Sequence, residues 1–218
     1  MAFCYHGIHH SSFIIHHLPL MQLILATNNA HKVAEINEIL RGSNLGTIDV
    51  ATMKNAVGHT TDLPETHETI IENAIEKAEF LYKTYGKSCF SEDSGLEIDA
   101  LGGQPGVHSA HYSGSRDAQD NIALVLKNMG NTDARTARFR TVICLILDGK
   151  QHLFEGVCEG KMRKKPSGTE GFGYDPIFQP KGFRTTFAQM DNAAKGRISH
   201  RGKATAKLLD FLLNLPSQ

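Results

Sequence analysis

The sequence predicts an α/β protein with a mixed central sheet flanked by helices. Short apolar runs alternate with segments of helical periodicity, which is the pattern of α/β domains. Two of the runs are joined by Asp148-Gly149, and this predicts a long hairpin that makes part of the sheet antiparallel. Because no internal repeat, low-complexity tract or linker interrupts the sequence, we expect one folded unit.

The composition is that of an ordinary globular protein, with 40% hydrophobic and 21% charged residues. Lys+Arg and Asp+Glu balance at 23 each, which disfavours binding to nucleic acid or membranes through a global field. An anionic ligand therefore needs a local cluster of cations. Cys4, Cys89, Cys144 and Cys158 show no CxxC spacing, and two of them lie in apolar runs. This favours reduced core thiols and a cytoplasmic location.

Residues 1–20 differ from the rest, with five of the 12 histidines and no Lys, Arg, Asp or Glu. They lack the cationic start of a secretory signal, and no apolar run is long enough to span a bilayer. We interpret them as a non-native extension or the result of a misassigned start codon, and expect disorder there. Met21 is then the natural first residue, and residues 21–218 form the domain.

The first predicted elements are a strand over residues 22–27, a helix over 32–40 and a second strand over 48–51. The strand assignments rest on short apolar runs, and the helix on its periodicity. The apolar face of the helix is formed by Val33, Ile36, Ile39 and Leu40.

A long helix is predicted to begin near Glu65, with Thr66 as its N-cap. Its expected buried stripe consists of Ile71, Ala74, Ile75, Ala78 and Tyr82. A third strand over residues 88–91 follows, and then an amphipathic helix over 116–129 with Asp117 near its start.

The hairpin strands are expected over residues 138–147 and 152–161, and the first of them is apolar on both faces. Such a strand belongs in the centre of a sheet. A final helix is predicted over 201–215, with a buried face of Ala204, Leu208, Leu212 and Leu215.

The pair Glu92-Asp93 lies between an apolar run and Gly95, where we expect a turn. Adjacent carboxylates repel each other and are unfavourable in a strand unless a cation offsets them. Glu72, at the core boundary of the long helix, is a further candidate. These three carboxylates are predicted to supply the oxygens of a Mg²⁺ site, although a solvated strand end would also explain an acidic pair.

Thr27, Asn29 and Lys32 stand where the first strand meets a helix. Helix N-termini attract anions through their unpaired N–H groups, so this junction is a candidate phosphate site. The alternative is an Asn-capped helix with a solvated lysine.

Two further clusters lie near the C-terminus. Phe172, Tyr174 and Asp175 occupy a glycine-rich loop over residues 168–176, where a ring is available to stack on a base. The alternative is a structural turn with one packed aromatic. Lys195 with Ser199-His200-Arg201 offers donors for a carbonyl or phosphate, although Ser199 is also explained as an N-cap.

From residue 21 onward the chain resembles the Ham1-like inosine triphosphatase family. The resemblance rests on five segments in family order: TNNAHK, IIENA, SEDSGLEIDALGGQPGVHSAHYSG, GFGYDPIF and ISHRGKA. It implies an elongated mixed sheet in two lobes with the active site in the cleft between them. It also implies hydrolysis of dITP, ITP or XTP to the monophosphate and pyrophosphate, Mg²⁺ dependence and a homodimer.

The resemblance implies a role for each matching residue. Asp93 corresponds to the residue that activates water, and Glu72, Asp93 and Glu92 to the metal site. Substrate contacts are implied for Thr27, Asn29, Lys32, Lys77, Ser94, Phe172, Tyr174, Asp175, Lys195, Ser199, His200 and Arg201.

The chain departs from the family pattern at four positions. His111 stands where many members have Arg or Lys, which weakens one cationic contact or makes it depend on pH. Glu92 replaces a more frequent Asp, and His67 and Ile70 replace the usual Gly and Phe.

Two rival functions remain. A Maf-type pyrophosphatase is disfavoured by GFGYDP and SHRGKA, and a nucleotide-binding module without catalysis is disfavoured by the intact carboxylate set.

Overall fold

The computed structural model describes residues 21–41, 48–58 and 61–215. Its helices and strands, in chain order, are β1 Met21–Ala26, α1 Ala30–Arg41, β2 Ile48–Thr52, α2 Met53–Val57, α3 Ile70–Tyr85, β3 Cys89–Ile98, β4 Pro105–Gly106, α4 Ala118–Met129, β5 Thr136–Leu147, β6 Lys150–Met162, β7 Phe178–Pro180, α5 Asn192–Ile198 and α6 His200–Leu213. The strands form a mixed sheet in the order β2-β1-β3-β5-β6-β7, with β4 paired to β3. This confirms the predicted α/β fold.

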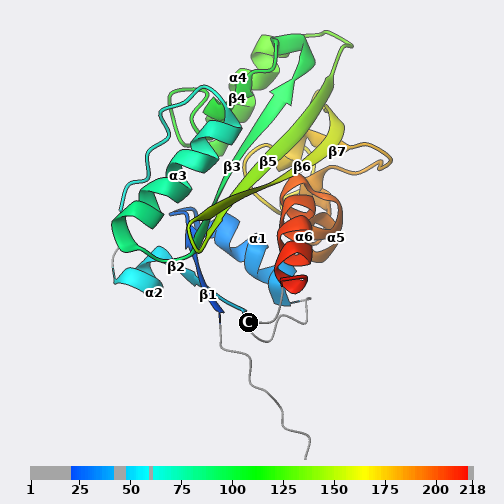
Figure 1. The fold of residues 1–218 in the computed structure, drawn as a ribbon. Coiled ribbons are helices and arrows are strands. Elements are labelled where there is room, and N and C mark those ends of the chain that lie inside the picture. The colour runs from blue at the N-terminus through cyan, green and yellow to red at the C-terminus, as the bar shows by residue number, and fades with distance from the viewer. Residues whose placement is uncertain (1–20, 42–47, 59–60, 216–218) are drawn as a thin grey trace, which may run out of the picture.

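One lobe is built around the parallel strands β2, β1 and β3 and the turn end of the β5–β6 hairpin (Figure 1). Helix α3 covers one face, where Ala74, Ala78 and Leu81 pack against Ile24 and Val142. Helices α1 and α6 cover the other face, packing against the alternate residues of the same strands. Residues 23–26 of β1 are therefore buried on both faces, which explains their apolar sequence.

The second lobe uses the far ends of β3, β5 and β6. There Leu96, Phe139 and Cys158 form a separate core with α4, which contributes Ile122 and Val125. The long strands thus run through both lobes, as the diagonal ribbons of Figure 1 show.

The hairpin is confirmed, with all residues from Thr136 to Leu147 paired to β6. Its turn places Asp148 and Gly149 at φ 49° and 78°, the positive values that favour Asp-Gly. The final helix is also confirmed, and Ser199 caps it by accepting a hydrogen bond from Gly202 N–H at 3.0 Å.

Two sequence expectations were wrong. Helix α3 begins at Ile70 with Thr69 as N-cap, rather than near Glu65 with Thr66. Ala74 and Ala78 of the expected stripe are buried, but Ile71 is 44% exposed while Ile70 is buried. Strand β3 does not end at the acidic pair but continues to Ile98, so Gly95 is a strand residue.

Gly95 still has a spatial reason to be glycine. A Cβ there would overlap the carbonyl oxygen of Gly106 in β4, so only a residue without a side chain lets β4 lie against β3.

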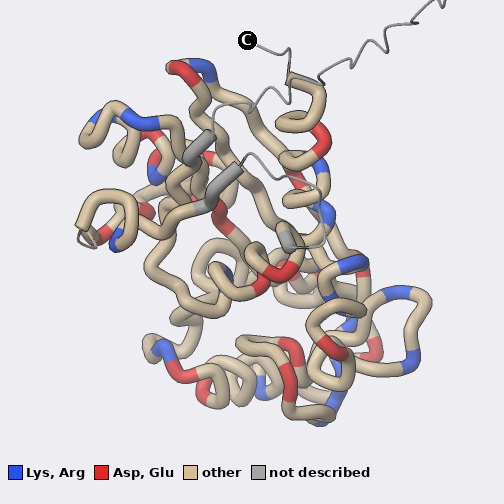
Figure 2. The backbone as a smooth tube through the Cα atoms, turned by 90° about the horizontal axis from the view of Figure 1, so that it is seen from below, with Lys and Arg blue, Asp and Glu red and all other residues tan. Residues whose placement is uncertain are grey.

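The predicted extension, residues 1–20, lies outside the described residues, as does Cys4. Cys89, Cys144 and Cys158 are free and buried. Burial raises the pKa of Cys89 and Cys144 to about 12, which keeps these thiols protonated. Within the described part of the chain, no helix combines the length and hydropathy needed to cross a bilayer. Figure 2 shows acidic and basic segments intermixed along the described backbone.

Candidate active site

A cavity of about 650 Å³ lies between the two lobes. Residues from β1, α1, α3, β3, the 172–175 loop, α5 and α6 line it. It brings together most of the residues predicted from the sequence: Thr27, Asn29, Lys32, Lys77, Asp93, Ser94, Phe172, Tyr174, Asp175, Lys195, His200 and Arg201. Glu72, Glu92 and Ser199 do not line it.

At one end, the turn from β1 into α1 presents the start of a helix to the cavity. The side-chain oxygen of Asn29 accepts hydrogen bonds from the N–H groups of His31 (3.0 Å) and Lys32 (3.3 Å). Thr27 accepts one from Asn29 N–H at 3.1 Å. The Asn-capped helix and the phosphate site are thus both compatible with this turn, since the Lys32 ammonium still lines the cavity.

Asp93 is the buried carboxylate of the cavity. One oxygen accepts a hydrogen bond from Lys77 Nζ at 2.8 Å. The other oxygen, Oδ2, is buried without a hydrogen-bond partner among the described residues. Burial raises the pKa of Asp93, and the nearby cations Lys77 and Lys32 only partly oppose this. A buried carboxylate with a raised pKa and one open oxygen is suited to accept a proton.

Lys77 joins Asp93 to a residue that the sequence did not single out, Glu65. The Lys77 ammonium lies 2.6 Å from the Glu65 carboxylate, and Glu65 lines the same cavity. Burial would lower the pKa of Lys77, but the two carboxylates more than compensate and raise it. Lys77 therefore stays charged and holds both acids at the cavity wall.

Glu72 is placed elsewhere, which corrects the predicted metal site. Its exposed side chain accepts a hydrogen bond from the Thr69 hydroxyl at 2.7 Å, and its N–H donates to the Thr69 oxygen at 3.2 Å. Because α3 starts at Ile70, Glu72 falls on its third residue, where an acid supports the helix N-terminus. Glu65 lies before the helix and reaches the cavity instead.

Glu92 also differs from its predicted role in a metal site. Consecutive strand residues face opposite sides of a sheet, so Glu92 and Asp93 point apart. Glu92 has a side chain that is 0% exposed, and it accepts hydrogen bonds from Arg201 at 2.7 and 3.0 Å and pairs with Lys32 at 2.8 Å. Burial alone would raise the pKa of Glu92, but Arg201 and Lys32 hold it well below its usual range.

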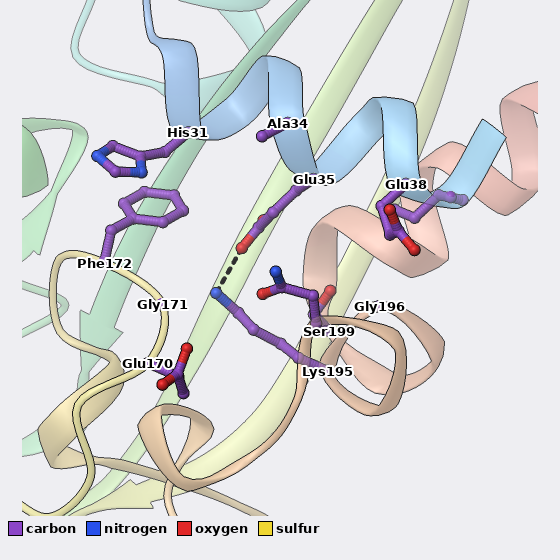
Figure 3. Close-up of a pocket in the computed structure, with 12 residues that line it drawn as sticks. His31, Ala34, Glu35, Glu38, Glu170, Gly171, Phe172, Lys195, Gly196 and Ser199 are labelled. Carbon is purple, nitrogen blue, oxygen red and sulfur yellow. Dashed lines mark hydrogen bonds and ion pairs between the residues drawn. The ribbon is translucent and has the colours of Figure 1, made fainter. Parts of the chain in front are cut away.

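Lys195 and Arg201, which also line the cavity, are bridged by Glu35, another residue that the sequence did not single out. Glu35 lies 2.5 Å from Lys195 Nζ and 2.5 Å from Arg201 Nη1 (Figure 3 shows the Lys195 pair). Lys195 also contacts Asp175 at 2.6 Å. In the sequence, the one feature that could have pointed to Glu35 is its position three residues after Lys32, on the same side of the predicted helix.

His200 is a further buried residue of the cavity. The His200 ring stacks on Phe139 at 4.5 Å, and its Nδ1 is buried without a hydrogen-bond partner among the described residues. Burial and the cations Arg201 and Lys195 hold the pKa of His200 well below its usual value, so its ring is neutral near pH 7. An unpaired buried nitrogen facing a cavity indicates a ligand contact.

Two predicted residues have structural duties. The Tyr174 hydroxyl donates to the Ser109 carbonyl at 2.9 Å, which ties the 172–175 loop to the second lobe. Ser199 caps α6 and lines a smaller cavity of about 240 Å³ beside the main one (Figure 3). His111, the expected cation position, is exposed and pairs with His108, while Arg116 lines the main cavity.

The residues present fit a divalent cation. No group of three or more His, Cys, Asp or Glu side chains is arranged as a metal site within the described ranges. Mg²⁺, however, is commonly held by one or two carboxylates together with substrate phosphates. Glu65 and the unpaired oxygen of Asp93 supply such hard oxygen ligands at the cavity.

Comparison with known proteins assigns the family. A model described as the Ham1 family matches residues 23–211. The dITP/XTP pyrophosphatase of Flavobacterium psychrophilum is 47% identical over 195 residues, which cover 89% of this chain and 100% of the relative. The enzyme of the same name from Bacillus subtilis is 41% identical over 88% of this chain and 98% of its own. The structure of a HAM1 protein from Coxiella burnetii aligns with a TM-score of 0.79 and 36% identity, over 89% and 100% of the two chains. The chain belongs to the Ham1 family.

Proposed function

We propose that this chain hydrolyses the non-standard purine nucleoside triphosphates dITP, ITP and XTP to the monophosphate and pyrophosphate, and so cleanses the nucleotide pool. The observation that carries the proposal is Asp93, whose buried and unpaired oxygen belongs to a residue that lines a cavity together with the cations Lys32, Lys195 and Arg201. The match to dITP/XTP pyrophosphatases over nearly their whole length supports the same activity.

In this mechanism Asp93 accepts the proton of the attacking water. Lys77 donates to Oδ1 of Asp93 and so fixes the carboxylate, while Oδ2 of Asp93 stays open for the water. Lys32 and the N-terminus of α1 bind the phosphates. Glu65 and Asp93 would hold Mg²⁺, which when bound neutralises charge that develops on the leaving pyrophosphate.

Selectivity for the base is assigned to the far end of the cavity. Lys195 and His200 offer hydrogen bonds to the 6-oxo group of hypoxanthine or xanthine. Adenine carries a 6-amino donor at that position, which leaves a buried donor of the protein unpaired and costs binding free energy. Phe172 stacks on the purine, and the fixed pair Asp175–Lys195 holds the loop that carries it.

We further propose a cytoplasmic homodimer. The reduced and buried cysteines support an intracellular setting, and the dimer follows from the resemblance stated above. Light scattering after size-exclusion chromatography measures the mass directly, and a monomer at micromolar concentration would exclude the dimer.

The deciding experiment is pyrophosphate release from dITP, XTP, dATP and dGTP with Mg²⁺. We expect kcat/KM for dITP and XTP to exceed the value for dATP by at least about 100-fold, because the 6-amino group of adenine leaves a buried donor unpaired, which costs a few kcal/mol. Guanine carries the same 6-oxo group, so the dGTP value measures any discrimination at the 2-position of the base. Equal turnover of all four would remove the proposed role, and release of inorganic phosphate instead of pyrophosphate would contradict the reaction.

A further inference from the structure

Both faces of the Phe172 ring are occupied in this structure. The imidazole of His31 stacks on one face, with a centroid distance of 5.1 Å and an interplanar angle of 15°. The Lys195 ammonium lies 4.9 Å and the Arg201 guanidinium 5.6 Å from the ring centroid. A purine can therefore stack on Phe172 only if one of these neighbours moves.

The cations are the fixed neighbours. Lys195 and Arg201 are 3% and 1% exposed, and both are paired with Glu35 at 2.5 Å. Moving either one breaks a buried ion pair, which is costly.

His31 is free to move. It is exposed and lies in the first turn of α1, where its backbone N–H donates to Asn29 and its ring contacts Phe172. Phe172 itself is held, because its N–H donates to Asp175 at 2.9 Å. The weakest part of the arrangement is thus the His31–Phe172 stack.

We infer that His31 is a placeholder for the purine: its ring covers the stacking face of Phe172 and must leave when the base binds. This inference rests on the proposed function and adds a specificity-determining residue to it. The flat imidazole is a small mimic of a purine five-membered ring and makes the same offset stack. Binding of the base therefore competes with an internal contact, which lowers affinity for the nucleoside part of any ligand.

The space around the stack allows this exchange. His31 and Phe172 line both the 650 Å³ cavity and the smaller 240 Å³ cavity, so the stack lies where the two adjoin. Figure 3 shows the two rings beside the residues of the smaller cavity. A His31 side chain that leaves Phe172 has solvent and the smaller cavity open to it.

The placeholder also makes the enzyme discriminate by stacking strength. A ligand with a poor stacking base, or with none, gains too little to displace the imidazole. Phosphate binding depends on the Lys32 side chain and the backbone N–H groups of the α1 N-terminus, which stay in place when the His31 ring leaves Phe172.

The test measures binding by calorimetry with two probes, inosine monophosphate and inorganic tripolyphosphate. For His31→Ala we expect inosine monophosphate to bind about 2- to 10-fold more tightly, the range of one aromatic stacking contact. Tripolyphosphate affinity should change less than inosine monophosphate affinity, because the substitution leaves Lys32 and the backbone of the α1 N-terminus in place. His31→Trp, with a better stacking ring, should weaken inosine monophosphate binding. His108→Ala is the matched control, because it removes an exposed histidine that is also in a ring pair, with His111.

A double-mutant cycle makes the test specific. In a Phe172→Leu background, which keeps apolar bulk but removes the ring face, His31→Ala should no longer change inosine monophosphate affinity. Unchanged or weaker binding by His31→Ala alone, or an equal effect on tripolyphosphate, would overturn the inference. If the unmodified protein fails to hydrolyse ITP, the proposed function fails, and the binding data still decide the role of His31.

Discussion

Lys77 and Asp93 form a buried ion pair in which Lys77 Nζ lies 2.8 Å from one carboxylate oxygen. The other oxygen has no hydrogen-bond partner among the described residues. This asymmetry separates two duties within one side chain. The paired oxygen orients the carboxylate, and the unpaired oxygen is available to a water molecule or a metal ion.

Asp93→Asn tests this division. The amide keeps the shape of the side chain but cannot accept the proton, so we expect kcat to fall by about 10²- to 10⁴-fold while nucleotide affinity is retained. In the unmodified protein, kcat/KM should fall as pH drops through the raised pKa of Asp93, because protonation removes the base. Substantial turnover by Asp93→Asn would show that another group activates the water. If the unmodified protein itself has no turnover, it is a nucleotide-binding module rather than an enzyme.

Glu65→Gln and Glu72→Gln form a matched pair. Glu65 shares Lys77 with Asp93 at the cavity, whereas Glu72 only supports the start of α3. We expect Glu65→Gln to lower activity at least about 10-fold and to raise the Mg²⁺ concentration needed for half-maximal rate, because metal affinity depends on each charged ligand. Glu72→Gln should change neither by more than about twofold. The reverse result would restore the metal site predicted from sequence.

The contrast between these two glutamates shows where sequence reasoning reached its limit. Periodicity located α3, but its first residue depends on which threonine caps it, and both Thr66 and Thr69 are acceptable caps. Because the start of the helix was predicted a few residues too early, the exposed Glu72 was chosen in place of Glu65, which lines the cavity. The first strand, the hairpin and the last helix were predicted because their signals are local. These signals are an apolar run, an Asp-Gly turn and a helical apolar face, respectively.

Long-range pairing set the rest of the site. The assignment of Glu92 to a metal site overlooked strand alternation, which follows only once β3 is known to continue through the acidic pair. Glu35 was overlooked because its partners, Lys195 and Arg201, lie more than 150 positions later in the chain. The separation leaves no local pattern, and only the packing of α1 against α5 and α6 reveals the cluster.

Arg201→Ala tests the stabilising role of that cluster. Among the described residues, the substitution leaves the fully buried Glu92 with Lys32 as its one cationic partner. We expect the free energy of unfolding to fall by about 3–5 kcal/mol, as for other broken buried ion pairs. Chemical denaturation measures the change. Arg184→Ala removes an exposed arginine and should cost less than about 0.5 kcal/mol, and equal losses in both variants would contradict a special role for Arg201.

His200 predicts a loss of stability at mildly acidic pH. Burial, Arg201 and Lys195 lower its pKa from an ordinary value of 6.5 in the folded protein. As pH falls below 6.5, the unfolded chain takes up a proton that the folded protein does not bind, so the free energy of unfolding decreases. The slope approaches about 1.4 kcal/mol per pH unit until the lowered pKa is reached. Chemical denaturation between about pH 7.5 and 5 measures this dependence. In the His200→Asn variant, the free energy of unfolding should depend less on pH over the same range.

Gly202 and Gly196 provide the last test, which concerns the packing of the helices that carry the cationic residues. A Cβ at Gly202 would overlap the carbonyl oxygen of Gly196, whereas a Cβ at Gly196 would meet only Ile39 at an ordinary 3.6 Å. We therefore expect Gly202→Ala to push α6 away from α5, to lower the free energy of unfolding by about 1–3 kcal/mol, and to raise KM because Lys195 and Arg201 separate. Gly196→Ala should be neutral or slightly stabilising, since alanine favours a helix more than glycine does. Thermal denaturation and steady-state kinetics on both variants measure these effects, and a Gly202→Ala protein that matches the Gly196→Ala protein in both would show that the close approach of the two helices does not position the cations.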